Sequence, residues 1–267
     1  MKLKKLTPTV FTFLLLSGLT LFGSTGSTTE ASEASDEEAR IKEVLNKLNL
    51  PGVRIDIEGF IDVDAQVAME YGMLELVACT EGTKEHESIV RVNAKAAHIH
   101  AALLLVGAQN GNPAMRRPIN EEMTRWTHIP PSGSPVEVSL VVEGPDGKPV
   151  ERPISDFIRK NLDNIYEPGS ASASETTGEA DGEAFPNSFL FTGSQLVDAR
   201  DGSRRYLADT SGHVITISTF GDEMLGLPGF QSRVNGELIW ELDTTHLPAL
   251  DEKVTLRLRP VFESAEG

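Results

Sequence analysis

The chain has 267 residues and a formal net charge of −16 at pH 7, because 40 acidic residues outnumber 24 lysines and arginines. A surface of this charge repels phosphate backbones and anionic lipid headgroups, so nucleic acid is not an expected partner. Cys79 is the single cysteine. No disulfide within the chain can therefore stabilise it, and the fold must depend on a hydrophobic core, which a chain of this length can form.

The first 26 residues have the pattern of a signal peptide. A start with three lysines is followed by an apolar stretch over residues 10–22 and by small residues at 23–26. The apolar stretch is shorter than the roughly 20 residues of a transmembrane helix, and the small residues suit a signal peptidase. We expect residues 1–26 to be cleaved, leaving a secreted or periplasmic protein without a stable membrane span. An uncleaved N-terminal anchor is the alternative.

A tether and a helix are predicted next. Residues 27–34 are small or polar and predict a flexible tether. Ser35 and Glu38 have the spacing of a capping box, and apolar residues recur at helical spacing over 41–48. The Pro-Gly pair at residues 51–52 should end this helix.

Three strands and an apolar helix follow in the prediction. Alternating apolar and polar residues predict a strand over 53–57, and apolar runs predict strands over 73–79 and 89–92. The polar loop over residues 80–87 would join the last two strands as a hairpin. Residues 94–106 are rich in alanine and leucine and predict a helix buried against a sheet.

The second half of the chain is predicted to contain mainly strands. A strand over 136–142 should turn back as a hairpin at residues 145–148, and a short helix is expected over 154–162. Residues 168–186 contain almost no large apolar side chains and predict a disordered insertion. Strand patterns resume at residues 188–196, 205–208, 214–218, 237–242 and 254–259.

Together these elements predict an α+β fold. Strands outnumber helices and the turns are short, which favours antiparallel pairing. We expect a twisted, largely antiparallel sheet with helices packed on one face. We assign residues 35–262 to a single domain that contains the insertion at 168–186. Two sub-domains divided at this insertion are the alternative.

One segment is rich enough in functional side chains to be a candidate site. Cys79 ends a predicted strand, His86 and Glu87 end the loop that follows, and the next helix carries His98 and His100. A thiolate with imidazoles suits zinc, copper or non-haem iron. A neighbouring imidazolium would also activate the thiol as a nucleophile. The two helical histidines are two residues apart, so at most one would face the thiol.

Each of these residues also has a purely structural interpretation. A single cysteine at a strand end, such as Cys79, is commonly a small buried hydrophobe. His86 lies in a charged loop, where a histidine is commonly solvated, and His100 lies on an apolar helix, where it is commonly a core residue. The sequence leaves both interpretations open.

A second group, Asp209, Ser211 and His213, has the residue types of a hydrolase triad. These residues are nearly consecutive in a predicted turn and strand, where neighbours face opposite sides. The chain also has no G-x-S-x-G motif. We therefore do not predict a triad there.

The chain resembles the YdjY-like domain family of exported bacterial proteins, and the resemblance is clearest around the candidate site. Weaker similarity extends over residues 50–262, apart from the insertion. The resemblance implies an exported domain without an established reaction. The matching residues are 74–79, 82–90, 100–104 and 107–108.

The resemblance also affects the choice of site residues. His86 and His100 match the family pattern, whereas His98 and His213 lie outside it. Some members resemble lipoproteins and are labelled ferredoxin-like. This chain has no cysteine directly after its apolar stretch to which a lipid could be attached. Its single cysteine, Cys79, is also too few for an iron–sulfur cluster, which takes about four protein ligands.

We therefore predict an exported, non-enzymatic domain that binds an unidentified small ligand or an extracytoplasmic protein. The alternative is a metal-dependent or thiol-redox protein with a site built from Cys79, His86, Glu87 and His100. The sequence identifies no cofactor, and it leaves open whether the protein is an enzyme.

Overall fold

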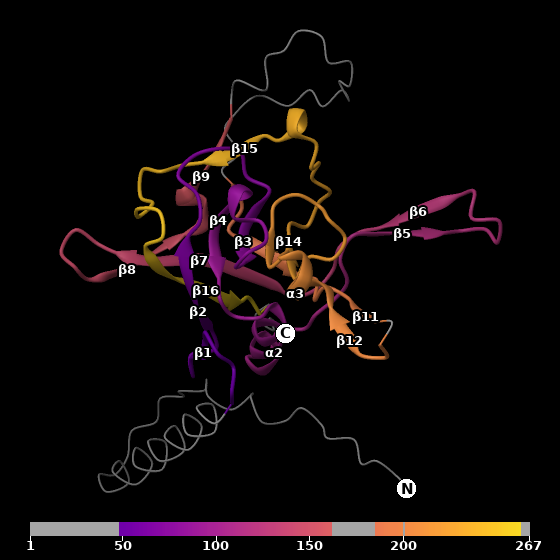
Figure 1. Ribbon diagram of the computed structural model, residues 1–267, viewed down its shortest axis with the longest axis horizontal. Coiled ribbons are helices and arrows are strands. Elements are labelled where there is room, and N and C mark those ends of the chain that lie inside the picture. Colours follow the sequence, from indigo (N-terminus) through magenta and orange to yellow (C-terminus); the bar gives the residue numbers. More distant parts are fainter. Residues whose placement is uncertain (1–47, 162–184, 200, 263–267) are drawn as a thin grey trace, which may run out of the picture. The chain divides into compact units, whose positions relative to one another are not determined.

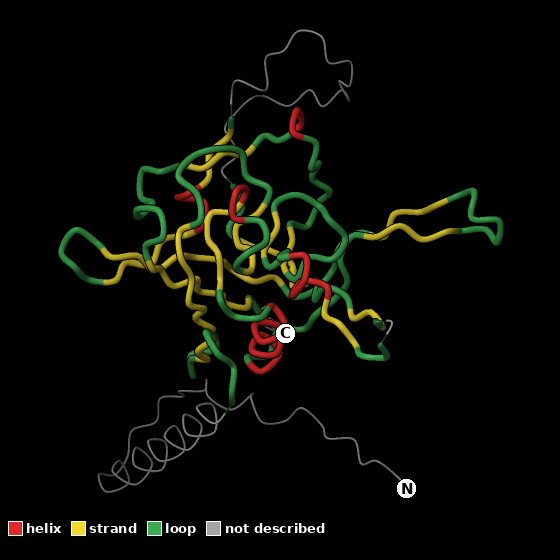
Figure 2. The backbone as a smooth tube through the Cα atoms, viewed as in Figure 1, coloured by secondary structure: helices red, strands yellow, loops and turns green. Residues whose placement is uncertain are grey.

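The computed structural model describes residues 48–161, 185–199 and 201–262 (Figure 1). These residues form mainly strands, together with long connecting loops (Figure 2). No helix in these three ranges is long and apolar enough to cross a membrane.

Several predicted elements lie outside the described residues. They are the signal peptide at 1–26, the tether at 27–34, the helix that begins at Ser35, and the insertion at 168–186 up to residue 184. Phe185, at the end of that insertion, is described and is 3% exposed, so it belongs to the core.

Most strands belong to one sheet that closes on itself. Its strand order is β1-β2-β16-β7-β10-β14-β13-β3-β4, with β8 paired to β7. Because β2 pairs with β4 as well as with β16, eight of these strands form a closed barrel, from which β1 and β8 extend. The strands are β1 (Val53–Ile55), β2 (Ile61–Val67), β3 (Leu76–Thr80), β4 (Ser88–Val92), β7 (Pro135–Glu143), β8 (Pro149–Pro153), β10 (Ser188–Phe191), β13 (Ile215–Thr216), β14 (Leu225–Gly226) and β16 (Lys253–Pro260).

The core is built from every second residue of the long strands. Successive side chains of a strand point to opposite faces, and in β2, β7 and β16 the buried positions alternate with more exposed ones. Large aromatic side chains complete the core, among them Phe157, Phe189 and Phe191, each 0% exposed.

Two α-helices occur in the described part of the chain, α2 (Ala96–Leu105) and α3 (Leu207–Ser211). Helix α2 buries Ile99 and Leu103, whereas Leu104 is 45% exposed. The side chain of Asp209 in α3 accepts a hydrogen bond of 3.0 Å from the backbone N–H of Ala97. Asp209 therefore caps the first turn of α2, which would otherwise have a free donor.

The predicted α+β class is wrong, because the described residues form a mostly β structure with a closed barrel instead of an open sheet covered by helices. Alternation shows that one face of a strand is buried, but it does not show what covers that face. The interior of a barrel can bury it, and so can a layer of helices. The strand that closes the barrel, β2, has the sequence Ile-Asp-Val-Asp-Ala-Gln-Val and was not predicted. The α2 prediction, by contrast, is confirmed to within two residues.

Two further predictions need correction. Residues 154–161, the described part of the predicted helix, do not form a helix. They form a single 3-10 turn, η2 (Ile154–Phe157), followed by strand β9 (Ile158–Lys160). The strands on either side of the 80–87 loop do not form a hairpin, because β3 and β4 pair in parallel. The only other parallel pair among the described strands is β13 with β14.

In the described part of the chain, three two-stranded sheets and two more 3-10 turns accompany the barrel. The sheet of β5 and β6 projects from it as an arm (Figures 1 and 2). These elements are β5 (Met115–Pro118) with β6 (Trp126–Ile129), β9 with β15 (Trp240–Leu242), β11 (Leu196–Asp198) with β12 (Arg204–Tyr206), η1 (Glu85–Glu87) and η4 (Asn235–Glu237).

Candidate functional site

Cys79, the first of the predicted site residues, is 0% exposed in β3. The parallel register places it opposite Arg91, near the end of β4, whereas Ser88 at the start of β4 pairs with Leu76. Burial raises the pKa of the Cys79 thiol, and hydrogen bonds with the Ser88 side chain and the Lys84 backbone oppose this only in part. The thiol is therefore held in its protonated, less reactive form.

His86 and Glu87 lie on η1 and have different surroundings. The His86 side chain is 75% exposed, with its Nε2 atom 3.6 Å from Glu87 Oε2. The Glu87 side chain is only 14% exposed, and its Oε1 atom is 2.5 Å from Lys84 Nζ. The nearest charged partner of Glu87 is therefore Lys84, and the imidazole of His86 lies further away.

His100 lies on α2 and takes part in a separate hydrogen-bonded chain. Its Nδ1 atom is 2.9 Å from the hydroxyl of Tyr206, which donates a bond of 3.0 Å to the carbonyl of Gly193. His100 also packs edge-on against Phe191 at 4.8 Å. Burial lowers the pKa of His100, so the imidazole is neutral at neutral pH.

The four predicted residues do not form a metal-binding group. Within residues 48–161, 185–199 and 201–262, no cluster of three or more histidine, cysteine, aspartate or glutamate side chains could hold a metal ion. Nothing in this geometry supports the metal or thiol-redox alternative.

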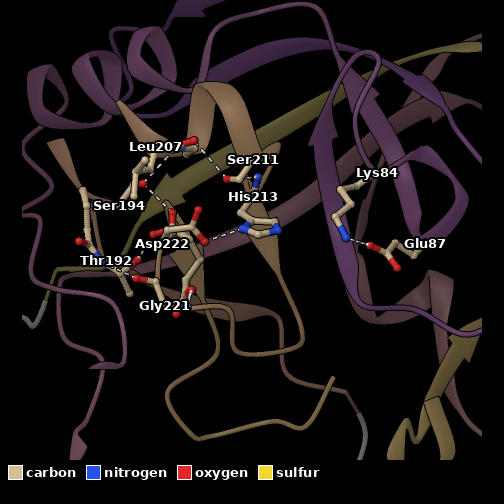
Figure 3. A network of polar contacts seen from close by, with 12 residues as sticks. Lys84, Glu87, Thr192, Ser194, Leu207, Ser211, His213, Gly221 and Asp222 are labelled. Carbon is tan, nitrogen blue, oxygen red and sulfur yellow. Dashed lines mark hydrogen bonds and ion pairs between the residues drawn. The ribbon is translucent and has the colours of Figure 1, made fainter. Parts of the chain in front are cut away.

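A different pair, His213 and Asp222, forms the candidate site (Figure 3). His213 Nδ1 is 2.5 Å from Asp222 Oδ1, and the two side chains are 10% and 18% exposed. Burial opposes ionisation of Asp222. The hydrogen bond from His213, the charge of that ring and the Ser211 hydroxyl nevertheless hold the pKa of the carboxyl below its usual range. Asp222 is therefore an ionised acceptor, and the proton lies on Nδ1 of His213.

The backbone fixes this pair in place. The N–H of Met224 donates to the carbonyl of His213 at 3.0 Å, which brings the segment before β14 beside the start of β13. The side chain of Ser194 donates to the carbonyl of Asp222 at 2.6 Å, and its N–H donates to the carbonyl of Glu223 at 2.9 Å. These bonds hold Asp222 in position through its own main chain.

The remaining ring nitrogen, His213 Nε2, is buried and has no hydrogen-bond partner among the described residues. Phe220 covers the ring, with the two ring centroids 3.9 Å apart and the planes 23° from parallel. Lys84 Nζ and the guanidinium carbon of Arg233 lie 5.5 and 5.9 Å from the Phe220 centroid. Three side chains that can carry positive charge therefore surround one aromatic ring.

The Lys84–Glu87 ion pair lies on the opposite side of the His213 ring from Asp222 (Figure 3). Glu75, which is 8% exposed, lies near this pair. Burial raises the pKa of Glu75, the charge of Glu87 raises it further, and Lys84 and Arg233 oppose the shift. The charges around His213 are thus mixed in sign.

Phe220 also lines an open pocket of about 770 Å³. It is formed between the β5–β6 arm and the segment 219–230, and most of its lining is apolar. The lining residues are Ala114, Met115, Arg116, His128, Ile129, Pro130, Pro131, Thr219, Phe220, Gly221, Pro228, Gly229 and Phe230. Phe220 is therefore a wall shared by the pocket and the His213 site.

Comparison with known families agrees with the resemblance seen in the sequence. The YdjY domain model matches residues 56–259. The chain belongs to the YdjY domain family. No curated protein and no solved structure shows a significant match. The YdjY match spans the barrel from β2 to β16 and includes both the His213 site and the pocket.

The site residues of this YdjY domain were only partly accessible from sequence. Of the residues that the sequence groups with His213, Ser211 bonds Asp222 and belongs to the site, whereas Asp209 caps α2, and the group lacks Asp222, which binds the ring. Asp222 follows His213 by nine residues across a pair of short parallel strands, a spacing that matches no motif.

Proposed function

We propose that the YdjY domain is a non-enzymatic binding domain that takes up a small amphipathic ligand with an apolar body and an anionic group. The pocket of about 770 Å³ beside the β5–β6 arm supports this proposal. Its size falls within the range of roughly 300–1,000 Å³ that is usual for small-molecule sites.

The apolar lining suits the body of such a ligand. Phe230 is 72% exposed, and the Met115 and Ile129 backbones are paired across the arm. Water leaves an exposed phenyl ring when a ligand covers it, which favours binding by roughly 25 cal/mol for each Å² of apolar surface. Phe230 should therefore contribute more to binding than the half-buried lining residues.

The polar part of the lining suits an anion. Arg116 and His128 are paired in register across the arm and are both exposed. Neither side chain makes an ion pair or hydrogen bond within the described ranges. An unpaired guanidinium on a chain with a net charge of −16 is a ready partner for a carboxylate, sulfonate or phosphate group.

We also propose that the domain acts outside the cytoplasm. The lysine-rich start, the apolar stretch over 10–22 and the small residues at 23–26 motivate this. N-terminal sequencing of the protein recovered from the periplasm or medium should find a first residue between 24 and 32. An intact Met1 would contradict cleavage.

The binding proposal can be tested with 8-anilinonaphthalene-1-sulfonate, which combines an apolar aromatic body with a sulfonate. Its fluorescence should rise in a saturable way with the folded protein. Phe230→Ala should weaken binding by about tenfold, the equivalent of about 1.4 kcal/mol. Arg116→Gln should also weaken binding, because it removes the charge that faces the sulfonate.

Two matched variants control for nonspecific effects. Leu196→Ala removes an apolar side chain that is 56% exposed on the separate β11–β12 sheet. Arg117→Gln removes the charge next to Arg116 in the sequence at a position that does not line the pocket. If Leu196→Ala weakens dye binding as much as Phe230→Ala does, the pocket is not the binding site.

A further inference from the structure

The His213 site contains a polar atom that the fold itself leaves unsatisfied. His213 is 8% exposed, and its Nε2 atom has no hydrogen-bond partner in the described chain. A buried polar atom without a partner destabilises the folded state, because it gives up its hydrogen bonds to water and gains none. Such atoms are rare in folded proteins and call for a specific explanation.

The partner of Nδ1 determines what Nε2 can bind. Asp222 is ionised and accepts the hydrogen bond from Nδ1–H. In the neutral ring, Nε2 is then a bare acceptor with a lone pair in the ring plane. It can be satisfied by a group that donates a hydrogen bond.

The surrounding charges restrict the class of donor. Lys84 and Arg233 lie against Phe220, the ring that covers His213, so a cationic donor would be repelled. An anion would be repelled by Asp222 and Glu87, and it has no proton to give to Nε2. A neutral hydroxyl group is the donor that fits this mixture of charges.

Phe220 is in contact with the His213 ring and also lines the pocket. One face of its ring stacks on His213, while the residue also lines the pocket. Phe220 is partly exposed and lies in the loop between β13 and β14. The carbonyl of Gly221, the next residue, accepts a hydrogen bond of 2.6 Å from Gln195 Nε2, so the backbone beside Phe220 is held in place, whereas the side chain can still change its rotamer.

We propose that His213 Nε2 is a binding site for a ligand hydroxyl group, which reaches it from the pocket when the Phe220 side chain turns aside. Asp222 fixes the tautomer that makes Nε2 an acceptor, and Phe220 excludes water while the ligand is absent. This inference rests on the proposed function in one respect, since the pocket is the way in. The ligand would then have two polar contacts of different kinds. Its hydroxyl group would donate a hydrogen bond to His213 Nε2, and its anionic group would accept hydrogen bonds from Arg116.

Phenol and anisole are suitable test molecules, because both carry an aromatic ring and only phenol donates a hydrogen bond. The full chain is labelled with ¹⁵N-histidine and studied by long-range ¹H–¹⁵N NMR at about pH 8, above the usual histidine pKa. His213→Gln assigns the His213 signals among the six histidines. The ring should show a proton on Nδ1 only, and phenol but not anisole should shift the Nε2 resonance.

Variants of Phe220 and Asp222 test the mechanism. Phe220→Ala removes the side chain that must turn aside, so phenol should bind about tenfold more tightly. Phe220→Leu keeps an apolar cover and should give a smaller gain. Asp222→Asn weakens the hold on the Nδ1–H tautomer and should reduce the phenol-induced shift of Nε2.

Two results would overturn the proposal. One is an Nε2 resonance that phenol leaves unchanged in the wild type, in Phe220→Ala and in Phe220→Leu. The other is an equal shift with anisole, which would show ring stacking without a hydrogen bond. Dye binding that depends on Phe230 together with a silent Nε2 would refute this inference alone. A responsive Nε2 without Phe230-dependent dye binding would refute the proposed pocket ligand instead.

Discussion

At the scale of single residues, burial and partners separate the histidines and the cysteine into different roles. Cys79 is fully buried and His86 is exposed. His100 is partly buried beside Tyr206, and His213 is buried beside Asp222. Only His213 combines an anionic partner with a buried ring nitrogen that has none in the described residues. Residue type alone could not distinguish His213 from the others, because the distinction depends on contacts between distant segments.

Asp222 should stabilise the fold as well as orient His213. Asp222→Ala leaves the buried Nδ1–H without an acceptor, so the free energy of unfolding should fall by about 1–3 kcal/mol. Because the pKa of Asp222 is lowered in the folded state, its contribution is present above the usual aspartate pKa and is lost as the pH falls through the lower folded value. Urea denaturation of both proteins over a range of pH measures this difference, which should shrink in strong acid. Equal stability at neutral pH would contradict the assigned bond.

His100 should make the fold sensitive to mild acid. Its pKa is lowered by burial, so the unfolded chain takes up a proton below about pH 6.5 while the folded chain does not. The free energy of unfolding should therefore decrease as the pH falls through that value. His100→Asn keeps an N–H donor for Tyr206 but cannot titrate, so its stability should change less between about pH 7 and pH 5.

The exposed His246 provides the matched control for this pH effect. His246→Asn should leave the pH dependence of the wild type unchanged. If His100→Asn has the same dependence as the wild type, another group is responsible for the acid sensitivity.

At the scale of elements, periodicity within one segment predicted a helix and long strands, but it did not predict the direction in which β3 and β4 pair. The helix at α2 and the long strands β7 and β16 follow from periodicity within one segment, and the structure has them close to the predicted bounds. The parallel pairing of β3 with β4 could not be read from either strand, because a loop of seven residues usually joins antiparallel neighbours. Because of this pairing, Cys79 lies opposite Arg91, and the two strands do not form the predicted hairpin.

Substitution of Gly212, in the turn after α3, would test how tightly the loop before η1 packs on the segment that contains His213. Gly212 has φ +83°, and a Cβ atom added to it would overlap the side chain of Thr83. Gly202 has nearly the same φ, +81°, but nothing lies within 4 Å of an added Cβ. Both substitutions by alanine carry the left-handed backbone strain, about 1–2 kcal/mol.

Gly212→Ala should therefore lower the free energy of unfolding by more than Gly202→Ala does, because only the first also displaces Thr83. Chemical denaturation of the two variants gives the comparison directly. Equal losses of unfolding free energy in the two variants would mean that the 80–84 loop moves at little cost. The loop would then not hold the His213 segment in place.

At the scale of the whole molecule, the sequence indicated strands, an apolar helix and the family, but not the way in which the sheet buries its apolar face. Closure depends on β2, in which Asp62 and Asp64 alternate with the buried residues Ile61, Val63 and Ala65. In the structure, Asp62 forms a two-bond ion pair with Arg257 of the neighbouring strand β16. A cross-strand partner almost two hundred residues away is invisible in the local pattern, so the fold class was predicted incorrectly.

The central claim is that a small amphipathic ligand occupies the pocket between the β5–β6 arm and Phe220. Chemical-shift mapping of the intact protein, labelled at the methyl groups of methionine and isoleucine, tests this claim most directly. Titration with 8-anilinonaphthalene-1-sulfonate should shift the methyl signals of Met115 and Ile129, which line the pocket. The signals of Met69 and Ile61, which are buried in the core and do not line the pocket, should stay unchanged. Saturable dye binding without a shift at Met115 or Ile129 would contradict the account.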